Sequence, residues 1–147
     1  MSAVVPATGN FVVADRLNHR IRHCTFPGGD VTTLAGSGVA QFLDGVGQAA
    51  SLNAPYGIAV FPNSASLVTS DAANGRVRFI TIPGGVVTSV GGGAGIATDG
   101  VGTSATFADL RGVAITAQGI VIVGDSGNNK LRAMWVACQG RWARQAQ

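Results

Sequence analysis

The chain alternates short apolar runs with clusters of Gly, Pro, Asn and Asp. The apolar runs are rich in Val, Ile, Thr and Phe, as at residues 57–61 and 86–90. Short runs of this composition between turn-forming residues predict β-strands. No run repeats apolar residues at the spacing of a helix, and each of the 22 Gly would cost a helix interior about 1 kcal/mol. We therefore expect an all-β chain.

The same order of residues occurs three times. Residues 13–22, 69–78 and 123–132 each contain an Asp, then an Asn, then two basic residues separated by one apolar residue. A Pro-Gly-Gly turn follows at residues 27–29 and again at 83–85. A repeat spacing of about 55 residues points to a propeller or a solenoid.

Each unit has the pattern of four short strands. In the second unit they are residues 57–61, 67–70, 76–80 and 86–90. The first is almost continuously apolar, which suits burial on both faces. In the third strand, alternation places both Arg side chains on one face and Val77 on the other. We therefore expect a half-exposed outer strand.

These motifs resemble those of NHL repeats. The family signature is an inner Gly-Ile-Ala-Val strand, then Val-Tyr-Val-Ala-Asp, then Asn-x-Arg-Ile-Arg, and residues 57–60, 11–15 and 18–22 are similar to it. The connector with Thr-Leu-Ala-Gly at 33–36 and Asp-Gly-x-Gly from Asp44 is typical of one subgroup. The resemblance covers residues 1 to about 136. It implies an all-β β-propeller of four-stranded antiparallel blades, about three of them present.

We expect a single propeller segment. Its parts are blade one at 1–36, a connector at 37–56, blade two at 57–91, a connector at 92–111, blade three at 112–138 and an atypical tail at 139–147. Three blades are fewer than the roughly four to eight that close a ring. The terminal blades would expose apolar flanks. Two solutions stay open: a homodimer that closes a six-bladed ring, or further blades in a longer chain.

Residues that recur in every unit are interpreted as structural. The Asp and Asn are expected to fix the turn between the second and third strands, and an Arg to pair with the Asp. These structural repeat residues are Asp15, Asn18, Arg20, Arg22, Asp71, Asn74, Arg76, Arg78, Asp125, Asn128 and Arg132. The Asp-Gly-Val-Gly motifs at Asp44 and Asp99 are interpreted as turns, because a calcium loop needs more acidic oxygens.

Residues that occur once are available for function. In an antiparallel blade, the entry to the first strand and the turn between the second and third strands lie at the same end. Loops on a rigid scaffold are where binding residues concentrate. At this end we expect a binding face of exposed loop residues, namely Arg16, His19, Tyr56, Asp109, Arg111 and Lys130. The prediction is a non-catalytic binding or scaffolding segment with a protein or other macromolecular partner.

Two other functions stay open. Some relatives of the NHL fold are metal-dependent lyases or hydrolases with His and acidic ligands on inner strands, but the inner strands here have none. Catalysis would then depend on blades outside this chain. RNA binding is known in some NHL proteins, and the net charge is +3. Most of the basic residues belong to the repeat or the tail, and Tyr56 is the one aromatic expected to stack a base. We do not expect nucleic acid as the partner.

No metal site or cofactor is expected. His19 and His23 lack a third ligand, and the chain has no Cys-x-x-Cys pair. Cys24 is interpreted as a small buried apolar residue, and Cys138 follows the end of the repeat pattern. We see no leader peptide and no apolar run of the roughly 20 residues that span a membrane. The location stays open, with the cytoplasm as the default.

Overall fold

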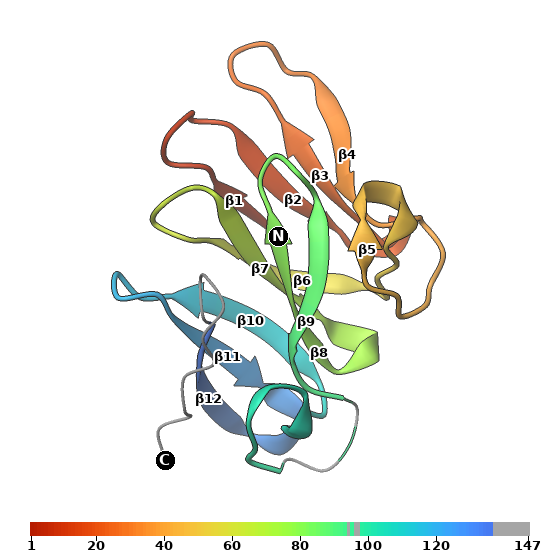
Figure 1. The fold of residues 1–147 in the computed structure, drawn as a ribbon, viewed down its shortest axis with the longest axis vertical. Helices are drawn as coiled ribbons and strands as arrows, with labels where there is room; N and C mark the ends of the chain where they lie inside the picture. The colour runs from red at the N-terminus through yellow and green to blue at the C-terminus, as the bar shows by residue number, and fades with distance from the viewer. Residues whose placement is uncertain (94, 96–97, 137–147) are drawn as a thin grey trace.

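The computed structural model describes residues 1–93, 95 and 98–136. The described strands form three antiparallel sheets that follow one another along the molecule (Figure 1). This confirms the all-β prediction, and the helical elements of the described residues are short 3-10 turns. The strands are β1 Ser2–Val4, β2 Phe11–Asp15, β3 Arg20–Cys24, β4 Val31–Ala35, β5 Gly45–Val46, β6 Pro55–Val60, β7 Ser66–Asp71, β8 Arg76–Thr81, β9 Val86–Gly91, β10 Leu110–Ile115, β11 Ile120–Asp125 and β12 Lys130–Trp135.

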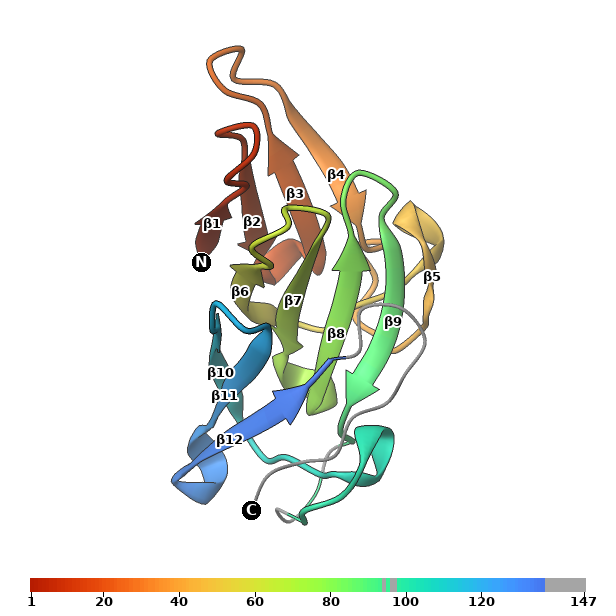
Figure 2. The same cartoon turned by 60° about the vertical axis from the view of Figure 1, so that its left-hand side comes forward.

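Strands that follow one another in the chain pair within each sheet, except that β5 pairs with β9. The first sheet has the order β1-β2-β3-β4, the second has β5-β9-β8-β7-β6, and the third has β10-β11-β12. Neighbouring sheets meet through their first strands, because β6 contacts both β1 and β10. Figure 2 shows these strands side by side, with β4 and β9 farther out. The turns after β2 and β7 therefore lie near β6 and β10, the inner strands of the sheets that follow.

The first connector contains a strand that the sequence did not predict. Gly45–Val46, interpreted as part of a turn, forms β5 and pairs with β9. Edge strands carry unpaired backbone groups, and β5 satisfies some of those on β9. The 3-10 turn Gly47–Ala49 follows at once. The second sheet therefore takes its outermost strand from the connector that precedes it.

The inner strands β6 and β10 begin earlier than predicted. Their first residues stand two positions before Gly57 and Gly112, where the sequence placed the strand starts. The pairing register of each strand shifts near its start, which marks a β-bulge. Tyr56 and Arg111, predicted as loop residues, therefore lie within bulged strand segments. A bulge changes the direction of a side chain, and bulges are frequent beside functional sites.

Two apolar cores lie between the sheets. The first joins the first and second sheets and includes Ile21 and Leu67, with Leu52 from the connector. The second joins the second and third sheets and includes Val77, with Phe107 from the other connector. Each core is thus built from two facing sheets and the connector between them. The packing of sheet on sheet holds the turn ends of the strands in fixed positions.

The third strand of the second unit is not half exposed as predicted. The side chain of Arg78 is fully buried, because residues of the first connector cover it. The equivalent Arg22 in the first sheet keeps 26% of its side chain exposed. Cys24, predicted to be buried, is only partly buried for the same reason, since no described connector covers the first sheet. The atypical tail at 139–147, and Cys138, lie outside the described residues.

Candidate binding face

Two arginines from different sheets lie over the ring of Tyr56. The Cζ atom of Arg16 is 5.6 Å from the ring centre, and that of Arg111 is 5.3 Å from it. Arg16 comes from the turn after β2, Tyr56 from β6 and Arg111 from β10. Both arginines are exposed, while Tyr56 is partly buried. An exposed cation–π contact contributes about 0.5–1 kcal/mol. The three sheets thus each supply one residue to a single cluster.

Asp109 completes this cluster. Its carboxylate accepts a hydrogen bond of 2.9 Å from Nε of Arg111 and forms an ion pair of 2.7 Å with Nη2. The carboxylate raises the pKa of Arg111 above its ordinary value, mainly through this hydrogen bond. Arg16 forms no ion pair among the described residues. We use the name Tyr56 cluster for four residues, Arg16, Tyr56, Asp109 and Arg111. Within this cluster the guanidinium group of Arg16 has no carboxylate partner.

The other two residues predicted for the face lie outside the cluster. The ring Nδ1 of His19 accepts a hydrogen bond of 3.0 Å from the backbone N–H of Ala54, which fastens the first sheet to the segment before β6. Lys130 is exposed at the start of β12, and no contact between it and the cluster is found in the described part of the chain. The structure therefore brings together four of the six predicted residues.

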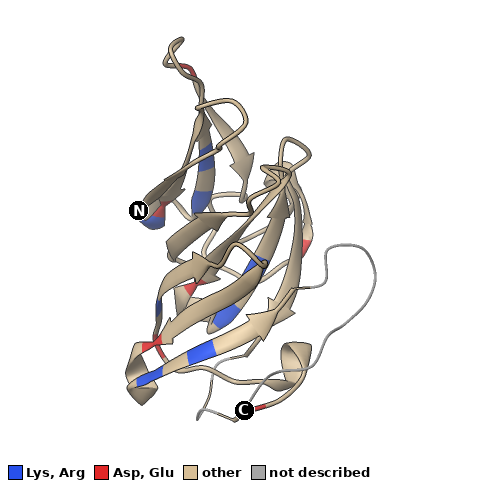
Figure 3. Cartoon of the chain, turned by 90° about the vertical axis from the view of Figure 1, so that its left-hand side faces the viewer, with Lys and Arg blue, Asp and Glu red and all other residues tan. Residues whose placement is uncertain are grey.

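The recurring residues form the same network in each sheet. In every copy the Asn amide donates a hydrogen bond to the Asp carboxylate, at 2.9 Å for Asn18–Asp15, 2.9 Å for Asn74–Asp71 and 3.0 Å for Asn128–Asp125. The second basic residue pairs with that Asp, at 3.0 Å for Arg22–Asp15, 2.6 Å for Arg78–Asp71 and 3.6 Å for Arg132–Asp125. Figure 3 shows basic and acidic residues in each of the three sheets.

In the first two units, the first arginine of the pair contacts the chain that leaves its own sheet. Arg20 donates a hydrogen bond of 3.0 Å to the carbonyl oxygen of Ser37, and Arg76 donates one of 2.8 Å to that of Gly92. The repeated arginines therefore act within and between the sheets. Arg16, at a non-repeated position, remains exposed and has no ion pair among the described residues.

Asp71 is, like Asp125, a buried carboxylate of the network. It is fully buried, and the backbone N–H of Asn53 donates a hydrogen bond of 2.6 Å to it. Burial raises the pKa of this carboxyl group above its ordinary value of 3.8, while the hydrogen bonds from Asn74 and Asn53 and the charge of Arg78 act in the opposite direction. The end of β7 is thus tied to the segment just before β6 through a buried acid.

Sequence reasoning missed the role of the connector aspartates. The Asp44 carboxylate accepts a hydrogen bond of 2.7 Å from Nη2 of Arg78 and one of 3.2 Å from the backbone N–H of Ser89. Asp99 pairs with Arg132 in the third sheet in the same way. The signal was present in the sequence, because the Asp-Gly motif and this arginine keep nearly the same separation in both units. Each connector is therefore bound to the sheet that follows it by an ion pair.

Ser70 is a second residue that the sequence did not mark. Its hydroxyl donates a hydrogen bond of 2.7 Å to the carbonyl oxygen of Arg111 and accepts one of 2.7 Å from the backbone N–H of Gly57. It therefore joins β7 to the bulged starts of both β6 and β10. The equivalent positions in the other units are Ala14 and Gly124, so the only signal was that Ser70 does not recur.

In the part of the chain that the structure describes, no three His, Cys, Asp or Glu side chains gather into a group that could hold a metal ion. The same residues include no helix of the length and hydropathy needed to cross a membrane.

Successive antiparallel sheets with their first strands side by side define a β-propeller segment. Solved structures of similar fold include an auxiliary nutrient binding protein from Bacteroides ovatus (TM-score 0.73, 19% identity, covering 84% of this chain and 34% of that one). A protein of unknown function from Bacteroides thetaiotaomicron has a TM-score of 0.76 at 22% identity, covering 88% and 33%. An inactive variant of virginiamycin B lyase from Staphylococcus aureus has a TM-score of 0.54 at 12% identity, covering 90% and 40%.

At these identities the likeness shows the β-propeller fold alone. This chain spans about a third of the length of the two Bacteroides proteins. Among curated proteins, SUPPRESSOR OF QUENCHING 1, chloroplastic, from Arabidopsis thaliana is 35% identical over 74 residues, which are 50% of this chain and 7% of that protein. No family model matches the chain.

Proposed function

We propose that this chain is a non-catalytic binding segment of an NHL-type β-propeller, and that it holds an acidic protein partner at the Tyr56 cluster. One observation carries the proposal: exposed guanidinium groups from two sheets lie over one tyrosine at the junction of all three sheets. The position is fixed by β-bulges and by the Ser70 hydrogen bonds, so the cluster is organised before a partner arrives.

The chemistry of the cluster favours carboxylates. A guanidinium group offers planar, paired donors that match the two oxygens of a carboxylate. Arg16 has no ion pair among the described residues, and it faces solvent. The hydrogen bond to Asp109 fixes the orientation of the Arg111 guanidinium group. The N–H groups of Arg111 that do not bond to Asp109 are therefore held in a fixed direction. A partner that presents Asp or Glu side chains would thus gain charge-assisted hydrogen bonds from two sheets at once.

RNA fits this face less well. Single-stranded nucleic acid is held largely by stacking of bases on aromatic side chains. Both arginines already lie against the ring of Tyr56, so the ring offers less free surface to a base.

Fluorescence anisotropy of a labelled peptide of alternating Glu and Gly tests the proposal, with an alternating Lys and Gly peptide and an oligouridine RNA as matched ligands. We expect the acidic peptide alone to bind, and Arg16→Ala to weaken it about tenfold, as for the loss of a hydrogen bond to a charged group. Lys130→Ala serves as the control for a lost surface charge and should leave binding nearly unchanged. Tighter binding of RNA, with a steep loss as salt increases, would contradict the proposal.

We propose, in addition, that other blades cover the two outer flanks of this segment. Large apolar side chains are exposed on both, including Val31 at 61% on the first sheet and Leu131 at 79% on the third. The equivalents of Leu131 in the other sheets, Ile21 and Val77, are fully buried between sheets. A second copy or further blades of a longer chain would supply the cover, and the mass in solution by light scattering distinguishes them: a dimer supports the first and a monomer the second.

A further inference from the structure

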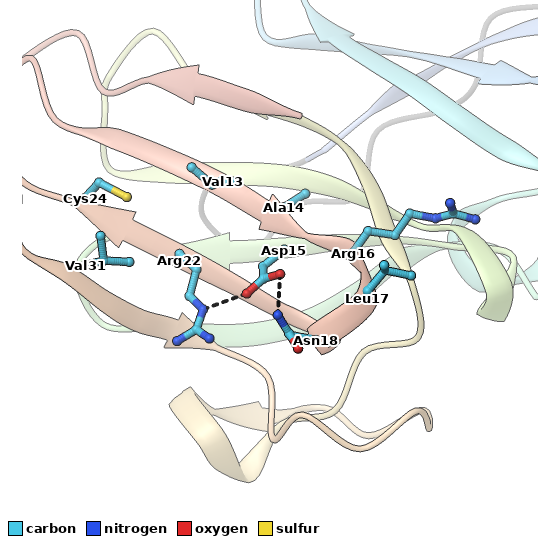
Figure 4. Close-up of a pocket in the computed structure, with 9 residues that line it drawn as sticks. All are labelled: Val13, Ala14, Asp15, Arg16, Leu17, Asn18, Arg22, Cys24 and Val31. Atoms are coloured by element: carbon cyan, nitrogen blue, oxygen red, sulfur yellow. Dashed lines mark hydrogen bonds and ion pairs between the residues drawn. The ribbon is translucent and has the colours of Figure 1, made fainter.

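A groove of about 620 Å³ runs along the outer face of the first sheet. Figure 4 shows the side chains that line it, with Asp15, Asn18 and Arg22 joined by hydrogen bonds at its centre. Apolar residues flank this polar centre, among them Leu17, which is 83% exposed, and Val31. The groove thus has apolar walls and a charged centre, in which the carboxylate of Asp15 already pairs with Arg22.

The second sheet shows what such a groove holds. The residue equivalent to Val31 is Val87, which is 1% exposed, and the one equivalent to Cys24 is Ile80, which is fully buried. Both lie in the core that the first sheet, the second sheet and the connector between them share, and the connector's strand β5 pairs with β9. The same site in the first sheet is open because no described connector lies on it.

The connector binds through atoms that the first sheet also offers. Arg78 donates hydrogen bonds of 2.7 Å to the carboxylate of Asp44, 2.9 Å to the carbonyl oxygen of Leu43 and 3.1 Å to that of Ser51. Asn74 donates one of 3.2 Å to the carbonyl oxygen of Gln41. In the first sheet, Arg22 and Asn18 hold the equivalent positions, and among the described residues they bond only to Asp15 and Thr33.

We infer that the groove on the first sheet is a docking site for a connector-type peptide segment, which has a large apolar residue followed by Leu-Asp-Gly and adds a short strand to the edge of β4. The Asp of the segment pairs with Arg22, as Asp44 pairs with Arg78. An extended segment that pairs with a free sheet edge gains main-chain hydrogen bonds, and its side chains give specificity. This inference is independent of the function proposed for the Tyr56 cluster, and it rests on the proposal that other blades cover the outer flank of the first sheet.

A folded second copy is a poor source of this segment. Both Asp-Gly connectors of the chain are already bound, Asp44 to Arg78 and Asp99 to Arg132. The residues from 137 onward contain no Asp or Glu, so their sequence offers no carboxylate for Arg22. The occupant is therefore a segment with an Asp-Gly connector supplied by a repeat other than the three in this chain.

The test uses a synthetic peptide with the sequence of residues 40–52 and the full chain carrying Cys138→Ser, so that Cys24 in the groove is the one reactive thiol. The rate of alkylation of Cys24 is measured as the peptide is added. We expect saturating peptide to slow the reaction about tenfold, since a bound segment would cover Cys24 as Ile80 is covered. A peptide with Asp44→Asn should need about ten times the concentration for half of the effect, because it lacks the charge-assisted hydrogen bond.

A double-mutant comparison makes the result specific. In a chain with Arg22→Gln, the two peptides should protect Cys24 equally, since the partner of the carboxylate is gone. The circular dichroism spectrum of this variant checks that it is folded. Equal protection by both peptides in the chain that retains Arg22, or none from either, would overturn the inference. Slow alkylation without any peptide, together with a dimeric mass, would also overturn it, because a second copy would then fill the groove.

Discussion

The carboxylate of Asp44 and the guanidinium of Arg78 form an ion pair of 2.7 Å between a connector and the sheet that follows it. The Arg78 side chain is fully buried, and it also pairs with Asp71 at 2.6 Å. The first sheet carries the same motif, yet Arg22 stays partly exposed. The repeat motif alone therefore does not decide whether its arginine is buried; the connector does.

This difference predicts unequal costs for the same substitution. Arg78→Met should lower the free energy of unfolding by about 3–5 kcal/mol, because it leaves two carboxylates without their buried partner. Arg22→Met should cost about 1 kcal/mol or less, because that ion pair is partly in solvent. Urea denaturation of both variants, followed by circular dichroism, measures the two values.

Should Arg78→Met prevent folding, Asp44→Asn offers a milder form of the same test. It removes one charge and keeps an acceptor for Arg78, and we expect a loss of about 1–3 kcal/mol. Equal losses for Arg22→Met and Arg78→Met would contradict the role assigned to the connector.

Two buried serines on β7 give a second matched pair. Ser70 bonds to the backbone of both β6 and β10, whereas the buried hydroxyl of Ser66 has no hydrogen-bond partner among the described residues. Ser70→Ala should therefore cost about 1–3 kcal/mol, since it leaves a buried N–H and a carbonyl unpaired. Ser66→Ala should be neutral or slightly stabilising. Thermal unfolding of both variants provides the comparison, and a larger loss at Ser66 would show that the link is assigned wrongly.

Two equivalent glycines give a third pair. A Cβ atom on Gly57 would clash with the carbonyl oxygen of Arg111, whereas one on Gly112 would have no atom within 4 Å. Gly57→Ala should thus force β6 away from β10 and cost about 1–3 kcal/mol. Gly112→Ala should change the stability little. Urea midpoints of the two variants test this, and similar midpoints would argue against the close approach of the two strands.

Much of the fold could be predicted from the sequence, because strand patterns and turn residues act locally. The strands around the Asp-Asn-Arg motif and the turn that it fixes follow from residues close in the chain. The strand β5 could not be predicted, since Gly45 and Val46 become a strand only by pairing with β9. The burial of Arg78 depends on the same long-range contact.

The candidate site was predictable in part for the same reason. The position of Arg16 follows from the repeat, because Arg16 comes directly after Asp15, whose place in the unit recurs in all three copies. Tyr56 and Arg111 were expected in loops, since a bulge at the start of a strand has no clear pattern in a single sequence. His19 faces the backbone of Ala54, a contact between units that local rules do not reveal.

The most direct test of the proposed binding face uses Tyr56 itself, which is the one tyrosine of the chain. Incorporation of 3-fluorotyrosine gives a single fluorine NMR signal from the centre of the cluster. We expect the Glu and Gly peptide to shift this signal in a saturable way. In the Arg16→Ala chain the apparent affinity from this titration should be about tenfold lower, and in the Lys130→Ala chain it should be unchanged. A signal that does not respond to the acidic peptide, or that responds equally in the Arg16→Ala chain, would contradict the account.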